Sequence, residues 1–193
     1  MEFQEVVRRR RMVRNFDDRP VAPEVVDRLL ANAVRAPSAG FTQGWAFLVL
    51  EGLEQTGRFW EASSPPGHDG ARRRWPGVLR APLIVVCLAR EQAYRDRYAE
   101  ADKANTDIGA VPWWYVDTGF AALLLLLTAV DAGLGALFLG VADPRGLHAA
   151  FDIPDDHTPV GAVAIGHPLP DERSASLARG HRPLDEVVHR GRW

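Results

Sequence analysis

Five arginines stand within seven positions near the start of the chain, in the stretch RRRRMVRNF at residues 8–16. A basic run of this kind usually marks a solvated surface or a patch that binds nucleic acid. The whole chain of 193 residues has a formal net charge of -2, so acidic residues elsewhere balance the local positive charge. A nucleic-acid partner is therefore not indicated.

Other sequence motifs with known chemistry are not indicated here, because the structural context or the residue spacing does not match. The stretch GLGALFLG at residues 133–140 follows an expected helix and opens an expected strand, the reverse of a dinucleotide-binding loop. Ser38 stands in PSAG, which is not the GxSxG of a nucleophile elbow. No glycine precedes Lys-Ser or Lys-Thr, which excludes a P-loop. The six histidines lack metal-binding spacing, so we expect no metal.

Cysteine usage and apolar segments bear on the compartment. The single cysteine, Cys87, excludes an intramolecular disulfide and lies in the apolar run PLIVVCLA, where we expect a buried and inert thiol. The first residues lack the apolar core of a signal peptide. The apolar segment at residues 120–130 is too short to span ~30 Å of hydrocarbon and is expected to be a core helix. We therefore expect a cytoplasmic protein without a membrane contact.

The elements that must position any site mix helices and strands. Hydrophobic spacing predicts helices at residues 2–11, 21–37, 91–100, 120–130 and 142–151. It predicts strands at residues 45–51, 81–90, 136–140 and 158–166. Irregular loops are expected at residues 63–77 and 112–115. No repeat or interior linker divides the chain, so residues 1–193 are expected to form one domain of the α+β or α/β class.

Four segments of the chain together resemble a known pattern. The first is Arg10-Arg11-Met12-Val13-Arg14-Asn15-Phe16, the second is PSAGFTQGW at residues 37–45, and the others are ALFLG and RGHRPLDEVVH in the second half. They resemble the nitroreductase superfamily of FMN-dependent oxidoreductases, whose signatures run roughly Arg-Arg-Ser-x-Arg-x-Phe and Pro-Ser-x-x-x-x-Gln-Pro-Trp. The order and spacing of the segments make the resemblance specific, and it covers nearly the whole chain.

The resemblance implies an architecture. Members of this superfamily have an α+β fold with a central, mostly antiparallel sheet surrounded by helices. They are typically homodimers with FMN at the subunit interface, and a C-terminal segment of each chain extends onto the partner. The patterned tail of this chain, which ends in Trp193, suits that role.

The resemblance also assigns roles to the arginines. Arg10 and Arg11 match positions that hold the phosphate and ribityl oxygens of FMN, and a guanidinium binds phosphate bidentately while it stays charged. Arg14 matches the cation near the pyrimidine edge of the flavin, where positive charge stabilises the anionic reduced ring and raises its reduction potential. Arg8 and Arg9 have no such counterpart, and we expect them at a solvated helix end.

Further cofactor-binding positions follow from the same matches. One group lies in the loop that meets the flavin, a second lies near its redox-active nitrogen, and a third provides basic residues for the phosphate. In that order they are Pro37, Ser38, Ala39 and Gln43; Leu139 and Gly140; and Arg179 and His181, with Arg182 as a near neighbour able to take the same role.

Three residues depart from the family pattern. Met12 replaces a serine that donates to the cofactor, and Phe41 and Gly44 replace an asparagine and a proline. One neutral hydrogen bond contributes only ~0.5–1.5 kcal/mol, so the charged contacts are expected to keep FMN bound. Phe41 is instead expected to line the substrate pocket with Trp113 and Trp114.

The implied activity is an FMN-dependent oxidoreductase that uses NAD(P)H to reduce a nitroaromatic, a quinone or a similar small acceptor. The flavin is reduced first and reoxidised second, a ping-pong mechanism that requires no catalytic acid or base from the protein. The alternative is a flavin- or deazaflavin-binding protein of the same fold with little or no turnover.

Overall fold

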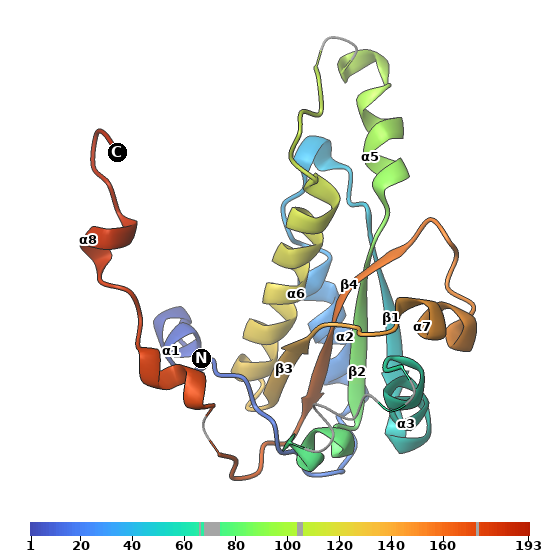
Figure 1. Ribbon diagram of the computed structural model, residues 1–193, viewed down its shortest axis with the longest axis vertical. Helices are drawn as coiled ribbons and strands as arrows, with labels where there is room; N and C mark the ends of the chain where they lie inside the picture. Colours follow the sequence, from blue (N-terminus) through green and yellow to red (C-terminus); the bar gives the residue numbers. More distant parts are fainter. Residues whose placement is uncertain (66, 68–73, 104–105, 173) are drawn as a thin grey trace.

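The structure is a computed structural model that describes residues 1–65, 67, 74–103, 106–172 and 174–193. Within these residues a four-stranded sheet in the order β1-β2-β4-β3 forms the centre (Figure 1). The strands are β1 (Trp45–Glu51), β2 (Leu83–Ala89), β3 (Gly135–Leu139) and β4 (Thr158–Gly166), and each pairing between them is antiparallel. The expected α+β fold with a mostly antiparallel sheet is confirmed.

Helices cover the two faces of the sheet, and further helices lie before and after it in the chain. The α-helices are α1 (Phe3–Arg9), α2 (Pro23–Ala33), α3 (Gly52–Ala62), α5 (Glu91–Tyr98), α6 (Trp113–Asp131), α7 (Pro144–Phe151) and α8 (Leu184–Val187). The short 3-10 helices are η1 (Ala39–Phe41), η2 (Pro76–Arg80), η3 (Ala101–Lys103) and η4 (Ala175–Arg179). Of the loop predicted at residues 63–77, residues 66 and 68–73 lie outside the described residues, and its last two residues, Pro76 and Gly77, belong to η2.

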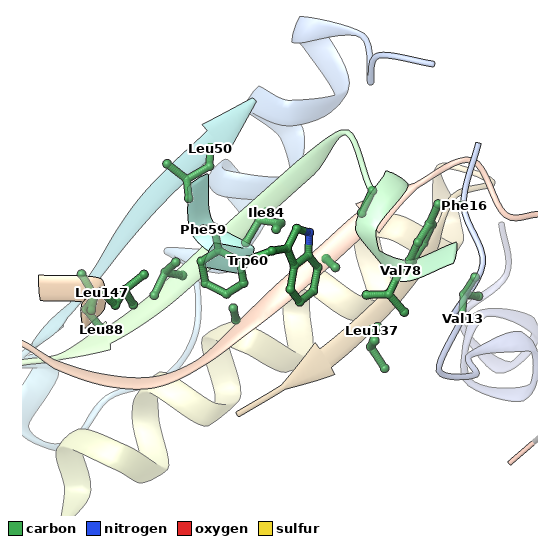
Figure 2. Packing of buried hydrophobic residues seen from close by; sticks show 14 of the residues in the cluster. Val13, Phe16, Leu50, Phe59, Trp60, Val78, Ile84, Leu88, Leu137 and Leu147 are labelled. Atoms are coloured by element: carbon green, nitrogen blue, oxygen red, sulfur yellow. The ribbon is translucent and has the colours of Figure 1, made fainter. Parts of the chain in front are cut away.

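The sheet separates two hydrophobic clusters, because successive side chains of a strand point to opposite faces. From β2, Ile84, Val86 and Leu88 pack with α3 and α7 on one face. Figure 2 shows Phe59, Trp60 and Leu147 of these helices close to the strands. The alternate residues Leu83, Val85 and Cys87 pack with α2 and α6 on the other face. A strand buried on both faces explains the continuous apolar run in the sequence.

Cys87 is fully buried in the second of these clusters. Burial raises the pKa of its thiol to about 12, since the charged thiolate is poorly solvated there. The expected burial of the thiol is confirmed.

The long helix α6 is apolar enough and long enough to cross a membrane by those two criteria alone. Its residues Ala121, Leu125 and Ala129 are fully buried in the fold, which explains the composition and confirms the predicted core helix. The helix begins earlier than predicted. Trp113 and Trp114 were expected in a loop, but they form the first turn of α6 after Pro112 at the N-cap, a place that proline tolerates.

The first helix ends earlier than predicted. Arg10 and Arg11 were expected to be helical, but α1 ends at Arg9 and Arg10 has φ -57° and ψ 119°. The backbone N–H of Val13 then donates to the carbonyl of Ala136 in β3 at 3.0 Å. The chain leaves the helix because this pairing needs an extended backbone.

The C-terminal tail, residues 174–193, extends away from the sheet on the side of α1 (Figure 1). It contains η4 and α8, and residues 175–193 are all exposed. Its exposed apolar side chains include Leu177, Leu184, Val187, Val188 and Trp193, the last 99% exposed. The tail therefore leaves apolar surface exposed to solvent.

Candidate functional site

The arginine run and the tail meet at one cleft. We call it the arginine cleft, and it has a volume of about 480 Å³. It is lined by Arg8, Arg9, Arg10, Arg11, Met12, Arg14, Glu172, Ser174, Ser176, Leu177 and His181. The structure thus brings five of the predicted cofactor-binding residues together: Arg10, Arg11, Met12, Arg14 and His181.

The edge of the sheet fixes the path of residues 10–14. Met12 forms a parallel bridge with Ala136 of β3, and Val13 is buried in the core beside it. The thioether sulfur of Met12 accepts from the backbone N–H of Phe138 at 3.5 Å. Met12 also packs against both hydrophobic clusters. The residue that departs from the family pattern therefore anchors the arginine segment to the sheet.

The arginines of the cleft differ in their ion pairs. Arg8 and Arg9 both pair with Glu5 on the exposed end of α1, as expected for a solvated helix end, although both also border the cleft. Arg11 pairs with Asp171, whose side chain is only 5% exposed. Arg10 pairs with no acidic side chain among the described residues. Among the four consecutive arginines at residues 8–11, Arg10 is therefore the one whose charge is most available to an anion.

The side chain of Arg14 lies between two clefts. Its guanidinium carbon lies 4.7 Å from the centre of the Trp75 ring, within the range of a cation–π contact. Its Nη1 donates to the carbonyl of Met12 at 3.2 Å, and its backbone N–H donates to Asp171 at 2.8 Å. It lines both the arginine cleft and a neighbouring cleft of about 440 Å³ that includes Trp75 and Arg80. Three contacts thus hold a cation beside the cleft.

A second group of predicted residues lies in the loop between α2 and β1, at residues 37–44. The backbone N–H of Gln43 donates to the Ser38 hydroxyl at 3.0 Å, and that of Ala39 donates to Asp117 at 2.8 Å. Gly40, Phe41 and Gln43 all have positive φ angles of 63°, 55° and 54°. Pro37 is exposed at the start of the loop, and Phe41 is 77% exposed.

The aromatic residues of α6 lie near this loop but do not line the arginine cleft. Trp113 donates its ring N–H to the carbonyl of Ile108 at 3.0 Å. The Trp114 ring packs edge-on against Tyr94, with 6.4 Å between the ring centres. Tyr94 is fully buried, and burial together with its hydrogen bond to Asp117 raises the pKa of its phenol. The two tryptophans are half-buried and lie at the end of the molecule that carries the loop at residues 37–44.

The two groups are far apart within one chain. The loop is tied to α6 at Asp117, whereas α1 is tied to α6 at Asp131, which pairs with the N-terminal amine at 2.6 Å. These fourteen steps along a helix correspond to roughly 21 Å at ~1.5 Å per residue. In Figure 1 the light-blue segment around residue 40 lies by the upper end of α6, whereas α1 and the N-terminus lie beside its lower half. A single chain therefore does not bring the loop and the arginine cleft into one site.

The remaining predicted cofactor-binding residues lie at the end of β3 and in the tail. Leu139 follows Phe138, the residue that contacts Met12, and packs partly into the core, while Gly140 is exposed after β3. In the tail, Arg179 and Arg182 do not belong to the lining of the arginine cleft. Arg182 instead pairs with Glu186 at 3.2 Å. Only His181 of the three predicted tail residues reaches the cleft.

Sequence reasoning missed four residues that hold these two groups in place: Asp171, Trp75, Tyr94 and Asp117. For Asp117 a signal existed, because it is the one charged residue in the interior of an apolar helix, and buried carboxylates need partners. For the other three no spacing pattern distinguishes them from surface or core residues, and only the folded chain brings them to the site.

Comparison with known proteins agrees with the fold. The sequence profile of the Nitroreductase family matches residues 7–167. The chain is 26% identical over 200 residues to a protein of Methanothermobacter thermautotrophicus named as an NADH dehydrogenase/NAD(P)H nitroreductase, covering all of this chain and 88% of that protein. It is 27% identical to an NADPH-dependent oxidoreductase of Staphylococcus aureus, covering 97% of this chain and 72% of that one.

Solved structures show the same fold. A nitroreductase family protein from Clostridium difficile superposes with a TM-score of 0.76 at 21% identity, over the full length of both chains. A protein from Exiguobacterium sibiricum, described as a nitroreductase in complex with FMN, also has a TM-score of 0.76, at 20% identity, covering 98% of this chain and 97% of that one.

Proposed function

Because this chain belongs to the nitroreductase family, we propose that it is an FMN-dependent oxidoreductase that uses NAD(P)H to reduce a small electron acceptor. The observation that carries the proposal is the arginine cleft, where Arg10 and Arg14 lie beside a tail residue, His181, in a space of about 480 Å³. Guanidinium groups that stay charged at any working pH are suited to a phosphate and to an electron-rich ring.

The residues present fit FMN in chemistry. Arg10 is free of acidic partners among the described residues and would hold the phosphate, with His181 also in the lining of the cleft. Arg14 is held by Trp75 and Met12 and would place its charge at the pyrimidine edge. Arg11 fits less well, because Asp171 already neutralises much of its charge. We propose that Arg11 orients Asp171 and the backbone of Arg14 more than it binds phosphate.

Bound FMN supplies hydride and electron transfer, which side chains alone do not provide. The protein's own contribution is to bind and orient. The Ser38–Gln43 loop would cover one side of the cofactor and Phe41 would offer an aromatic face to the acceptor. A nitroaromatic or a quinone suits such a face, and reduction and reoxidation at one shared site give ping-pong kinetics.

We further propose a homodimer in the cytoplasm with two sites at the interface. The support is that the loop and the N-terminus attach to α6 at Asp117 and Asp131, two points roughly 21 Å apart along the helix, a separation that a second copy related by a twofold axis would remove. The exposed apolar tail supports the same assembly, since Leu184 and Trp193 are 76% and 99% exposed in one chain.

The test uses the purified full chain. We expect it to bind added FMN with an absorbance at about 450 nm and to elute as a dimer in size exclusion with light scattering. NADPH or NADH added under nitrogen should bleach the flavin band, and a quinone or nitroaromatic should restore it. Initial rates at several acceptor concentrations should give parallel double-reciprocal lines.

Two outcomes would contradict the proposal at different levels. A protein that takes up no FMN under any loading condition would overturn the cofactor assignment. A protein that binds FMN but is not bleached by either nicotinamide would indicate the alternative, a flavin- or deazaflavin-binding protein with little turnover.

A further inference from the structure

A buried carboxylate joins three segments at the loop end of the molecule. Asp117 is only 2% exposed. Its Oδ2 atom accepts from the Tyr94 hydroxyl at 2.8 Å and from the backbone N–H of Ala39 at 2.8 Å. These bonds connect α6, α5 and the loop, so the carboxylate is placed to fix the loop relative to both helices. Burying a charged carboxylate costs free energy unless hydrogen-bond donors pair with it, so Asp117 needs both of its donors.

The loop that Asp117 holds has an unfavourable backbone. Phe41 and Gln43 have φ angles of 55° and 54°, a region that non-glycine residues rarely adopt. Such conformations are unfavourable and persist only where the surroundings determine them. Arg97 adds a third tie, since its Nε donates to the carbonyl of Gly40 at 2.9 Å. The loop is thus held in place against its local preference.

Tyr94 and Gly44 are matched in size. A Cβ atom at position 44 would lie 2.4 Å from Cε2 of the Tyr94 ring, a distance that real Cβ atoms do not show. The ring can reach Asp117 only because position 44 has no side chain. Gly44 is also the position where the family pattern has a proline, so this departure has a local cause in the place that Tyr94 takes.

We propose that Asp117, Tyr94 and Gly44 form a clamp that positions the Ser38–Gln43 loop for binding FMN and the acceptor. They are positioning residues, because they act through the loop and do not touch the cofactor themselves. The inference rests on the proposed function in one respect, the assignment of that loop to the flavin site. The clamp explains why a strained loop is kept: its exposed residues, above all Phe41, are presented in a fixed direction.

The test compares the affinity of each apoprotein for FMN, by fluorescence titration, with the midpoint of its thermal unfolding. Tyr94→Phe keeps the ring and removes the donor, and we expect the dissociation constant to rise about tenfold, in the range for a hydrogen bond to a charged group. Asp117→Ala should raise it further. Asp117→Asn should recover most of the loss, because both donors use one oxygen, which an amide also offers.

Asp96→Ala is the matched control, since it removes an exposed carboxylate, bonded only to Gln92 among the described residues, from α5, the helix that carries Tyr94. It should leave the FMN affinity unchanged. A merely structural role for Tyr94 and Asp117 would lower the unfolding midpoint and leave the FMN affinity of the folded protein unaltered, which would overturn the clamp. Failure of the wild-type chain to bind FMN would instead overturn the proposed function.

A size exchange tests the match between Tyr94 and Gly44 independently. Gly44→Ala should weaken FMN binding in the presence of Tyr94, because the new methyl group displaces the ring. In a Tyr94→Leu background the same change should add little further loss, a coupling that a double-mutant cycle measures. Equal losses in the two backgrounds would show that the residues act separately and would contradict the clamp.

Discussion

At the scale of single residues, the arginine run separates into members with different surroundings. Arg8 and Arg9 pair with Glu5, and Arg11 pairs with Asp171. Arg10 lacks an acidic partner among the described residues, and Arg14 lies against Trp75. A charge that is already paired contributes less to binding an anion, so the run is not a uniform basic patch. The resemblance separates Arg8 and Arg9 from the rest, but only the folded chain shows that Arg10 and Arg11 differ in their partners.

This difference leads to a prediction for two variants. Arg10→Ala should weaken FMN binding about tenfold or more, because it removes a charge-assisted contact to phosphate. Arg14→Ala should mainly lower the reduction potential of the bound flavin, since a cation near the ring stabilises its reduced form. Titration of the apoprotein and potentiometry of the holoprotein measure the two quantities. Parallel changes of both quantities in both variants would count against the separate roles.

At the scale of elements, two strands were predicted to the residue, whereas helix limits were not: α2 ends at Ala33, four residues before the predicted end. The strand runs at residues 45–51 and 158–166 match β1 and β4 to the residue, because apolar runs with glycine or proline nearby have clear limits. The end of α1 was wrong because the bridge between Met12 and Ala136 lies 124 positions apart in sequence. The predicted start of α6 was wrong because aromatic residues that follow a proline are also typical of a loop.

An element that the sequence does mark is α7, and it gives a stability prediction. Asp143 is its N-cap, and its carboxylate accepts from the backbone N–H of Gly146 at 2.9 Å. Asp143→Ala should lower the free energy of unfolding by ~1 kcal/mol, the typical value for a lost cap. Chemical denaturation of the apoprotein checks this, with Glu61→Ala on the exposed surface of α3 as control. FMN affinity should be unchanged, and no loss of stability would show that the cap is not needed.

At the scale of the whole molecule, the site is distributed in a way that no local pattern reveals. The family resemblance identified both the arginine segment and the Ser38–Gln43 loop, and the structure places them at opposite ends of α6. The residues that hold the loop come from two helices. Asp117 lies in α6, which the sequence indicates only as an apolar segment, and Tyr94 lies in α5, which the sequence indicates only as a charged helix. Tertiary distance and buried partners therefore account for the part of the site that sequence reasoning could not supply.

The distance between the loop and the arginine cleft has a consequence for mixtures of damaged chains. If each site takes the cleft from one chain and the loop from the other, Arg10→Glu and Ser38→Glu proteins are each inactive alone. A mixed dimer of the two has one site with both defects and one with neither. After random exchange of subunits, about a quarter of all sites should be whole, and FMN content and NADPH oxidation should return to that extent. Sites confined to one chain would recover nothing, so complementation between two inactive proteins reports directly on how the molecule is assembled.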